Sequence, residues 1–322
     1  MAKTAQAPGD PALALAYHAR TKHSLERYAA GPETLDWEMQ PNPFREFSGS
    51  ARLSLPLRAH ELSTTFAQVH GPETISPQPL ILDALGTLLQ LSMGLSAWKQ
   101  YGPDRWALRC NPSSGNLHPT EAYVLARGVA GLDDGLYHYL SRDHALELRC
   151  RYDPASGDPS RLAIGLSSIH WREAWKYGER AFRYCQLDVG HALAAIRYAA
   201  GVLGWNARMV DRCGSEQLAA AMGLDRSADF SGAEREDAEL LIAIDTLSGE
   251  PPACDGSAFE AWPAAGGQWT GRANLLDPRP IYRWPVIDQV SAATRGTIAG
   301  DRPPPSQHPP LQHASDRRAA DI

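Results

Sequence analysis

The stretch from Ile169 to Leu203 restricts the possible folds more than any other part of this sequence. Apolar side chains recur in it every three or four positions, at Val189, Leu193, Ile196, Ala200 and Leu203. Glycine and alanine fill much of the remainder. This period predicts a long helix. Because such small side chains let other backbones approach closely, we expect the helix to lie at the centre of the fold.

A second informative stretch, from Arg109 to Glu121, has the sequence RCNPSSGNLHPTE. Its two prolines fix the backbone on either side of two serines, a glycine and an asparagine. It leads directly into the apolar segment 122–126, which is typical of a buried strand. A polar loop in this place can hold a planar polar ligand, and Gly115 lets backbone N–H groups come close to it. An ordinary turn between a helix and a strand is the alternative.

The remaining segments mix helices with strands. Further helices are predicted over residues 14–28, 80–95, 215–222 and 286–294. Strands are predicted over 135–140, 145–148, 207–210 and 239–245, and the turn 141–144 joins the first two into a hairpin. Because the helices and strands do not follow the regular rhythm of a parallel sheet, the sequence predicts an α+β fold.

Composition and charge exclude several classes of function. A net charge of -6 without a dense Lys/Arg stripe argues against a nucleic-acid partner. The five cysteines are an odd number at wide spacings, which fits neither a disulfide framework nor a zinc site, so we expect reduced thiols in the cytoplasm. No apolar run has the length of a membrane span, and the first 20 residues lack the apolar core of a secretory signal.

The segment from Trp171 to Tyr184 is rich in both aromatic and charged residues. The charged residues Glu173, Lys176, Glu179, Arg180 and Arg183 lie at helical spacings. They form either an exposed face with its own ion pairs or part of a covered segment. In a covered segment the arginines need anionic partners, which are Glu173, Glu179 or a ligand phosphate.

Two histidines, His138 and His144, lie at the predicted hairpin. They are weak metal-ligand candidates, because no cysteine or acidic metal motif accompanies them. A metal-dependent hydrolase built on these histidines is therefore a minor alternative.

Three motifs in a fixed order point to a known family. They are PSSGNLHPTE at 112–121, GLYHY at 135–139, and ERAFRY at 179–184 with DVGHA at 188–192 and LG at 203–204. Together they resemble the nitroreductase superfamily, and within it the SagB/ThcOx type, whose best-known members oxidise azolines in peptide natural products. The similarity extends from about Leu80 to Asp245.

This resemblance implies an α+β fold with an antiparallel-rich central sheet flanked by helices, and a homodimer that holds FMN at its interface around the long small-residue helix. It implies cofactor contacts at two places. The first is the loop, with Arg109, Pro112, Ser113, Ser114, Gly115, Asn116 and His118. The second is the backbone at Gly204, Trp205 and Asn206, near the reactive edge of the flavin.

The activity that the resemblance implies is hydride transfer between flavin N5 and a small-molecule or peptide-derived substrate, with NAD(P)H as a candidate electron donor. The resemblance assigns no catalytic residue. The expected organisation is an N-terminal arm over 1–50, an FMN domain over 51–295 and a disordered tail over 296–322.

One feature departs from the family pattern. Family members usually carry an Arg-Arg-Ser-x-Arg motif that holds the FMN phosphate, but the equivalent region, 62–66, has no arginine, and Arg58 is the nearest one. This difference supports a second hypothesis, a flavin-free member that serves as a binding or scaffold subunit of a partner oxidoreductase. The first 50 residues also resemble a subgroup whose members often carry a second copy of the domain, so the chain either homodimerises or needs a partner chain.

Overall fold

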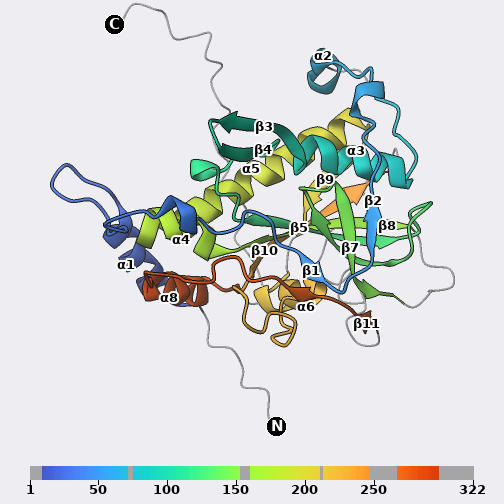
Figure 1. Cartoon of the computed structure of the whole chain (residues 1–322). Coiled ribbons are helices and arrows are strands. Elements are labelled where there is room, and N and C mark those ends of the chain that lie inside the picture. Colours follow the sequence, from blue (N-terminus) through green and yellow to red (C-terminus); the bar gives the residue numbers. More distant parts are fainter. Residues whose placement is uncertain (1–8, 72–74, 153–159, 211–212, 247–266, 297–322) are drawn as a thin grey trace, which may run out of the picture.

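The computed structural model describes residues 9–71, 75–152, 160–210, 213–246 and 267–296 (Figure 1). Its helices are α1 (Pro11–Thr21), α2 (Phe66–His70), α3 (Leu82–Ser92), α4 (His170–Tyr177), α5 (Ala181–Val202), α6 (Ser215–Met222) and α8 (Pro285–Ala293). Its strands are β1 (Phe47–Ser48), β2 (Arg52–Ser54), β3 (Leu95–Tyr101), β4 (Asp104–Arg109), β5 (Thr120–Arg127), β6 (Gly135–Leu140), β7 (Ala145–Arg151), β8 (Arg161–Ser168), β9 (Asn206–Met209), β10 (Asp237–Asp245), β11 (Gln268–Trp269) and β12 (Arg272–Ala273).

An antiparallel sheet forms the centre of the fold. Its strands follow the order β11-β7-β6-β5-β8-β10-β9, and β2 also pairs with β7. In the middle of the sheet, Val124 of β5 lies between Tyr137 of β6 and Ile164 of β8. The predicted α+β class and antiparallel sheet are therefore confirmed.

The long helix α5 lies across one face of this sheet together with α3 (Figure 1). Its small buried side chains Ala192, Ala199 and Ala200 let it come close to the strands, while Ile196 fills the space that remains. Gly190 is exposed, and a Cβ placed there would meet nothing within 4 Å. The central position expected for this helix is confirmed, and one of its faces stays uncovered in the described chain.

The helix predicted over 169–203 is two helices and not one. The chain breaks at Gly178, whose φ of 54° lies in the region that favours glycine. A Cβ at Gly178 would lie 2.6 Å from the carbonyl oxygen of Ala30, so the N-terminal residues also need the space that a side chain would take. The short 3-10 turn Gly178–Arg180 then leads into α5. The sequence did not indicate this break, because the helical spacing of apolar residues continues on both sides of Gly178.

Other predicted boundaries need smaller corrections. The first helix ends at Thr21 and not at Tyr28. The sequence prediction missed the hairpin of β3 and β4 that lies between α3 and the polar loop. The predicted hairpin of β6 and β7 is confirmed, and so are the strand β10 and the helices α6 and α8. The predicted tail falls outside the described residues, apart from Gly296.

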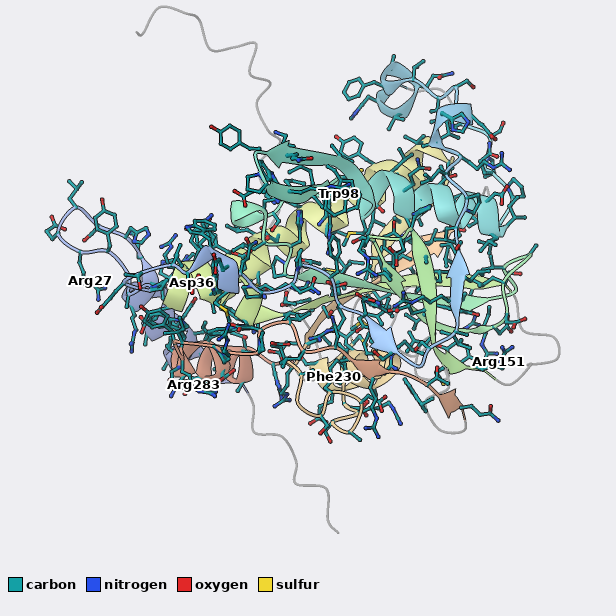
Figure 2. The ribbon with its side chains drawn as sticks, in the orientation of Figure 1. Arg27, Asp36, Trp98, Arg151, Phe230 and Arg283 are labelled. Carbon is teal, nitrogen blue, oxygen red and sulfur yellow. The ribbon has the colours of Figure 1, made fainter. Side chains whose placement is uncertain are left out.

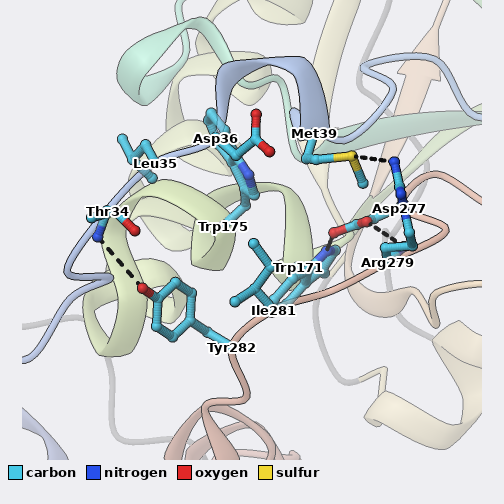
Figure 3. A pocket seen from close by; sticks show the side chains of 10 residues that line it. All are labelled: Thr34, Leu35, Asp36, Met39, Trp171, Trp175, Asp277, Arg279, Ile281 and Tyr282. Carbon is cyan, nitrogen blue, oxygen red and sulfur yellow. Dashed lines mark hydrogen bonds between the residues drawn. The ribbon is translucent and has the colours of Figure 1, made fainter.

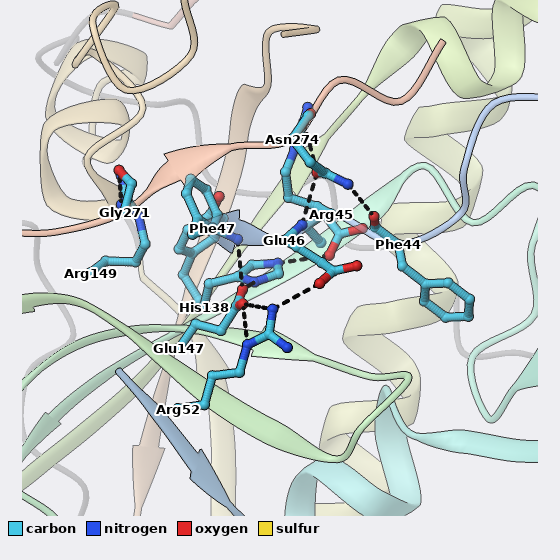
Figure 4. A network of polar contacts seen from close by, with 12 residues as sticks. Phe44, Arg45, Glu46, Phe47, Arg52, His138, Glu147, Arg149, Gly271 and Asn274 are labelled. Carbon is cyan, nitrogen blue, oxygen red and sulfur yellow. Dashed lines mark hydrogen bonds and ion pairs between the residues drawn. The ribbon is translucent and has the colours of Figure 1, made fainter. Parts of the chain in front are cut away.

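The second face of the sheet is covered by α6 and by parts of both chain ends. Phe47 of β1 packs there against Tyr123 and Phe230, and β1 pairs with β12. Arg45, labelled in Figure 4, is fully buried beside them and donates a 2.8 Å hydrogen bond to Glu236. Residues 44–48 of the expected N-terminal arm are thus part of the core. In the described residues, no helix has the length and apolar character needed to cross a membrane.

Candidate functional site

The polar loop of 110–119 joins β4 to β5 and forms a compact turn against α5. Its carboxylate anchor is Asp188, which accepts hydrogen bonds from Ser113 Oγ at 2.7 Å and from the Ser114 backbone N–H at 3.0 Å. Ser114 Oγ donates a further bond to the same carboxylate at 3.1 Å. Burial raises the pKa of Asp188, while the hydrogen bonds from the two serines oppose that rise. The serine hydroxyls therefore fix the shape of the loop.

The backbone of this loop adopts positive φ at three positions. These are Gly115 at 61°, Asn116 at 60° and His118 at 51°. The second and third are unusual for residues with a side chain and are strained. Their side chains hold each other, because Asn116 Oδ1 lies 2.9 Å from His118 Nε2. Backbone strain of this kind is common at ligand-binding and catalytic sites.

Two titratable side chains of α4 lie against Gly115. A Cβ on this glycine would be 2.5 Å from the Tyr177 hydroxyl and 3.1 Å from Lys176 Nζ. No residue with a side chain fits there without movement. Burial raises the pKa of Tyr177, and the nearby Glu173 adds to the rise. Gly115 and Pro112 are themselves exposed, so the outer side of the loop is open to a ligand.

A buried charge cluster supports the loop from below. Arg172 donates to the His118 carbonyl at 2.7 Å and forms an ion pair with Glu121. Glu121 also lies 2.9 Å from His138, and the other nitrogen of that ring lies 3.0 Å from Glu147. The cluster continues toward the surface through Arg52, which Figure 4 shows beside Glu147.

The charges of this cluster decide the protonation of its histidines. Burial lowers the pKa of His138, but the hydrogen bonds that its ring donates to Glu121 and Glu147 outweigh this effect and raise that pKa. In contrast, burial and the nearby Arg109 and Arg172 lower the pKa of His118 to about 2. His118 is therefore neutral at pH 7. No group of three metal-ligating side chains exists in the described part of the chain, and His138 pairs with carboxylates instead.

Several buried polar atoms near the loop have no hydrogen-bond partner in the described chain. They are Arg109 Nε, Asn111 Oδ1, His118 Nδ1, Thr120 Oγ1, two nitrogens of Arg172 and both carboxyl oxygens of Glu173. Buried polar atoms normally have a partner, so a cluster of exceptions marks a site that takes water or a ligand. Burial raises the pKa of Glu173 well above its usual range, and Asp188 adds to the rise. Glu173 lies three positions before Lys176 and four before Tyr177 on α4.

The predicted contact residues of the loop differ in what they offer a ligand. Arg109 is buried and donates to the carbonyls of Thr120 and Pro43. Asn116 donates to the Ala107 carbonyl at 2.9 Å. With both serines bound to Asp188, the exposed Pro112 and Gly115 and the loop backbone are the parts most open to a ligand.

The second predicted contact, at 204–206, lies elsewhere in the chain. Gly204 follows the C-terminal end of α5, so roughly 20 Å of helix separates it from Asp188. A Cβ on Gly204 would lie 2.7 Å from the Ile75 carbonyl oxygen. Trp205 is buried and donates to the Gln78 carbonyl, while Asn206 is exposed. A single chain does not bring the two predicted contact regions together.

The region expected to hold a phosphate offers no free cation among its described residues. Arg58 lies 2.6 Å from Glu61 and 3.5 Å from Asp83. Two arginines near the N-terminal end of α5 are also engaged: Arg20 binds Glu179, and Arg183 donates to Thr21 and to the His18 carbonyl. The ion pairs considered within 173–183 are therefore replaced by contacts with α1.

Residues 34–39 of the N-terminal arm cover the outer side of α4. Trp37 meets Trp175 edge to face at 5.4 Å, and Lys176 lies 5.3 Å from the Trp37 ring. Figure 3 shows Asp36 and Met39 over this helix, with Trp171 bonded to Asp277 below them. Residues 34–39 therefore cover α4 next to the loop, while Pro112 and Gly115 of the loop itself stay exposed.

The hairpin of β3 and β4 leads into the loop and carries Trp98, which is labelled in Figure 2. The ring centroids of Trp98 and Phe44 lie 6.3 Å apart.

Sequence reasoning did not single out Asp188, Glu173, Lys176 and Tyr177 as site residues. The last three occupy one turn of α4. Their spacing was visible, but it equally fits an exposed helix face with ion pairs. Only the contact of Gly115 with α4 shows that these residues lie at the loop and not on an exposed helix face.

Comparisons with known proteins agree with the family resemblance of the sequence motifs. No protein-family model matches the chain. The "Trifolitoxin-processing protein TfxB" of Rhizobium leguminosarum bv. trifolii is 30% identical over 168 residues, which are 47% of this chain and 45% of the relative. A Methanocaldococcus jannaschii protein named "Putative nitroreductase" is 28% identical over 137 residues, 39% of this chain and 66% of the relative.

A solved structure described as a nitroreductase is also similar to this chain. A protein described as a "putative nitroreductase" from Anabaena variabilis aligns with a TM-score of 0.57 and 28% identity. The alignment covers 75% of this chain and 47% of that one. The chain therefore spans about half to two thirds of the length of these relatives. The fold and the relatives agree with the resemblance that the loop motif indicated, and the chain is similar to members of the nitroreductase superfamily.

Proposed function

We propose that this chain is an FMN-dependent oxidoreductase that acts on a peptide-derived substrate. The observation that carries the proposal is the strained loop at 113–118, held by Asp188 and bordered by Lys176 and Tyr177. FMN, when bound, supplies hydride transfer at its N5. The peptide substrate class comes from the relative named as a trifolitoxin-processing protein. NAD(P)H is the electron donor we propose where the reaction is a reduction.

Each side chain of the site has a task in this proposal. The loop backbone at Pro112 and Gly115 supports the flavin ring, and Asp188 keeps that backbone in place. Lys176 and Tyr177 hold and move a proton at Nζ and at the phenol oxygen, next to the loop. Glu173 lies one turn before Tyr177, and its raised pKa favours a role as a further proton donor.

We also propose that the active unit is a homodimer built on α5. The exposed residues Leu187, Gly190, Ala194 and Tyr198 form a stripe along this helix, and Leu187 is 56% exposed. Packing two such stripes together lets the loop of one chain approach the 204–206 region of its partner. We propose a cytoplasmic location for this dimer, in keeping with the reduced thiols expected from the sequence; the four described cysteines form no disulfide.

The second candidate is a flavin-free subunit that binds a partner oxidoreductase. It is favoured by the engaged state of Arg58, which leaves the described residues 58–66 without an unpaired arginine for a phosphate. In this case the loop completes a flavin site on the partner chain.

A visible spectrum of the purified protein, before and after incubation with FMN, separates the two candidates. Flavin bands with maxima near those of free FMN, in a particle with the mass of a dimer, are the result expected for the enzyme. If no flavin is retained and the fluorescence of added FMN is unchanged, the enzyme proposal fails and the subunit proposal stands.

A further inference from the structure

Lys176 has unusual neighbours for a half-buried cation. Its Nζ lies at the loop, 3.1 Å from where a Cβ on Gly115 would be. Among the described residues it forms neither an ion pair nor a hydrogen bond. It lies instead over two aromatic rings, 5.3 Å from the ring centre of Trp37 and 5.5 Å from that of Tyr177. A cation within about 6 Å of a ring centre is attracted to the negative face of that ring. The two rings therefore attract the ammonium in the place of a carboxylate.

Trp37 reaches this position from the N-terminal arm, which is fixed on both sides of it. Before Trp37, the Thr34 N–H donates to the Tyr282 hydroxyl at 3.4 Å. After it, Arg279 donates to the sulfur of Met39 at 3.1 Å. Figure 3 shows both contacts as dashed lines. The place of the Trp37 ring is thus set by contacts that do not involve Lys176.

The Trp37 ring covers its neighbours only in part. It meets the buried Trp175 edge to face at 5.4 Å, but Trp37 itself is 60% exposed. A tryptophan that served only to cover α4 would bury most of its own apolar area, because burial of that area is what stabilises the contact. The exposure of Trp37 therefore favours a role for its ring face toward Lys176.

A ring differs from a carboxylate as a partner for a lysine. It attracts the charge but accepts no proton, so the lysine keeps its proton available for transfer. The carboxylates around Lys176 do not pair with it in the described chain. Asp188 accepts hydrogen bonds from the loop serines, and Asp36 accepts one from the Glu38 N–H at 3.1 Å. Glu173, one turn earlier on α4, forms no ion pair with Lys176 among the described contacts.

We propose that Trp37 is a positioning residue of the candidate active site, which holds the Lys176 ammonium against its ring and beside Gly115. The inference rests on the proposed function in one respect, that Lys176 moves a proton next to the loop. A group that is held in place before the reaction loses less freedom during it. The N-terminal arm, expected from the sequence to lie outside the FMN domain, then supplies part of the site.

Fluorinated tryptophans placed at position 37 test the attraction, because ring fluorines weaken the negative face and change the size of the ring little. The readout is acetylation of Lys176 by acetic anhydride, measured by mass spectrometry on the whole chain without flavin. Only the unprotonated amine reacts, so a ring that holds the ammonium less tightly speeds the reaction. We expect the rate to rise with each added fluorine, by about threefold in total relative to the exposed Lys99. The same fluorination of Trp98, which lies 4.2 Å from Arg105, is the matched control and should leave the Lys176 rate unchanged.

Two substitutions separate the ring face from simple cover. Trp37→Leu keeps an apolar side chain without a ring and should speed acetylation of Lys176, while Trp37→Phe restores a ring and should reverse part of that increase. A rate that does not depend on the number of fluorines, or an equal increase in the two variants, would overturn the proposal. The labelling is done without flavin, so its outcome is independent of whether the visible spectrum shows bound FMN.

Discussion

The carboxylate of Asp188 on α5 accepts a 2.7 Å hydrogen bond from Ser113 Oγ, which joins the central helix to a loop 75 positions earlier in the chain. Ser114 adds two donors to the same carboxylate. The helix that packs on the sheet therefore also fixes the backbone of the candidate site. Any movement of α5, such as one caused by dimerisation, is transmitted to the loop through this contact.

Replacement of Asp188 by asparagine removes the charge while keeping the size of the side chain. Hydrogen bonds to a charged group contribute about 1.5–3 kcal/mol, so we expect the free energy of unfolding to fall by about 2 kcal/mol. FMN affinity, measured by fluorescence quenching, should fall at least tenfold because the loop loses its fixed shape. The variant Asp104→Asn, at an exposed position on β4, is the control and should change neither quantity. Unchanged FMN affinity in Asp188→Asn would show that the loop does not need this contact.

Replacement of Gly115 by alanine should damage the site more than the general stability. A methyl group there would be 2.5 Å from the Tyr177 hydroxyl, and the φ of 61° adds a backbone cost of about 1 kcal/mol. The matched control is Gly102→Ala, with a φ of 58° and no atom within 4 Å of the added Cβ. Gly115→Ala should lose somewhat more stability to urea than Gly102→Ala, because only its methyl group meets Tyr177, and only Gly115→Ala should lose FMN binding. Equal FMN binding by the two would argue against a ligand at the loop.

The His170–Asp237 pair predicts a loss of stability at alkaline pH. The pKa of His170 is about 9 in the folded chain, above the value of about 6.5 in the unfolded chain. The folded state thus binds the proton more tightly, and this stabilisation is complete below pH 6.5 and is lost as pH rises through 9. Urea denaturation should show a decrease of about 3 kcal/mol between pH 6 and pH 10 that is absent from His170→Gln. A parallel pH dependence in both proteins would contradict the assignment.

The buried pair of Arg45 and Glu236 predicts a strong non-additive effect. Both side chains are fully buried and lie 2.8 Å apart. Arg45→Met leaves a buried carboxylate without its partner, which costs about 3–5 kcal/mol. The double variant Arg45→Met/Glu236→Gln should be more stable than the single variant, because no unpaired charge remains. Additive losses in a thermal denaturation cycle would show that the two residues act independently.

Local sequence patterns predicted many of the helices and strands of this fold, but not β3, β4 or β8. The apolar periods predicted α6, α8 and the strands β6, β7 and β10 at nearly their observed positions, because a helix or strand buries one face at a fixed period. The single helix predicted over 169–203 covers both α4 and α5. The motif at 112–121 also indicated the loop. The break at Gly178 was hidden, since the apolar period continues on both sides of it.

The tertiary structure decided which groups meet at the site. Asp188 and Lys176 are helical residues that fit an exposed helix face as well as a site, and only packing brings both of them to the loop. The same is true of His170, whose pKa depends on carboxylates about 70 positions away. Sequence alone determined the periodic elements and the loop, because these depend on neighbours along the chain. The contacts between α4, α5 and the loop depend on how the sheet folds back on itself, which no local pattern specifies.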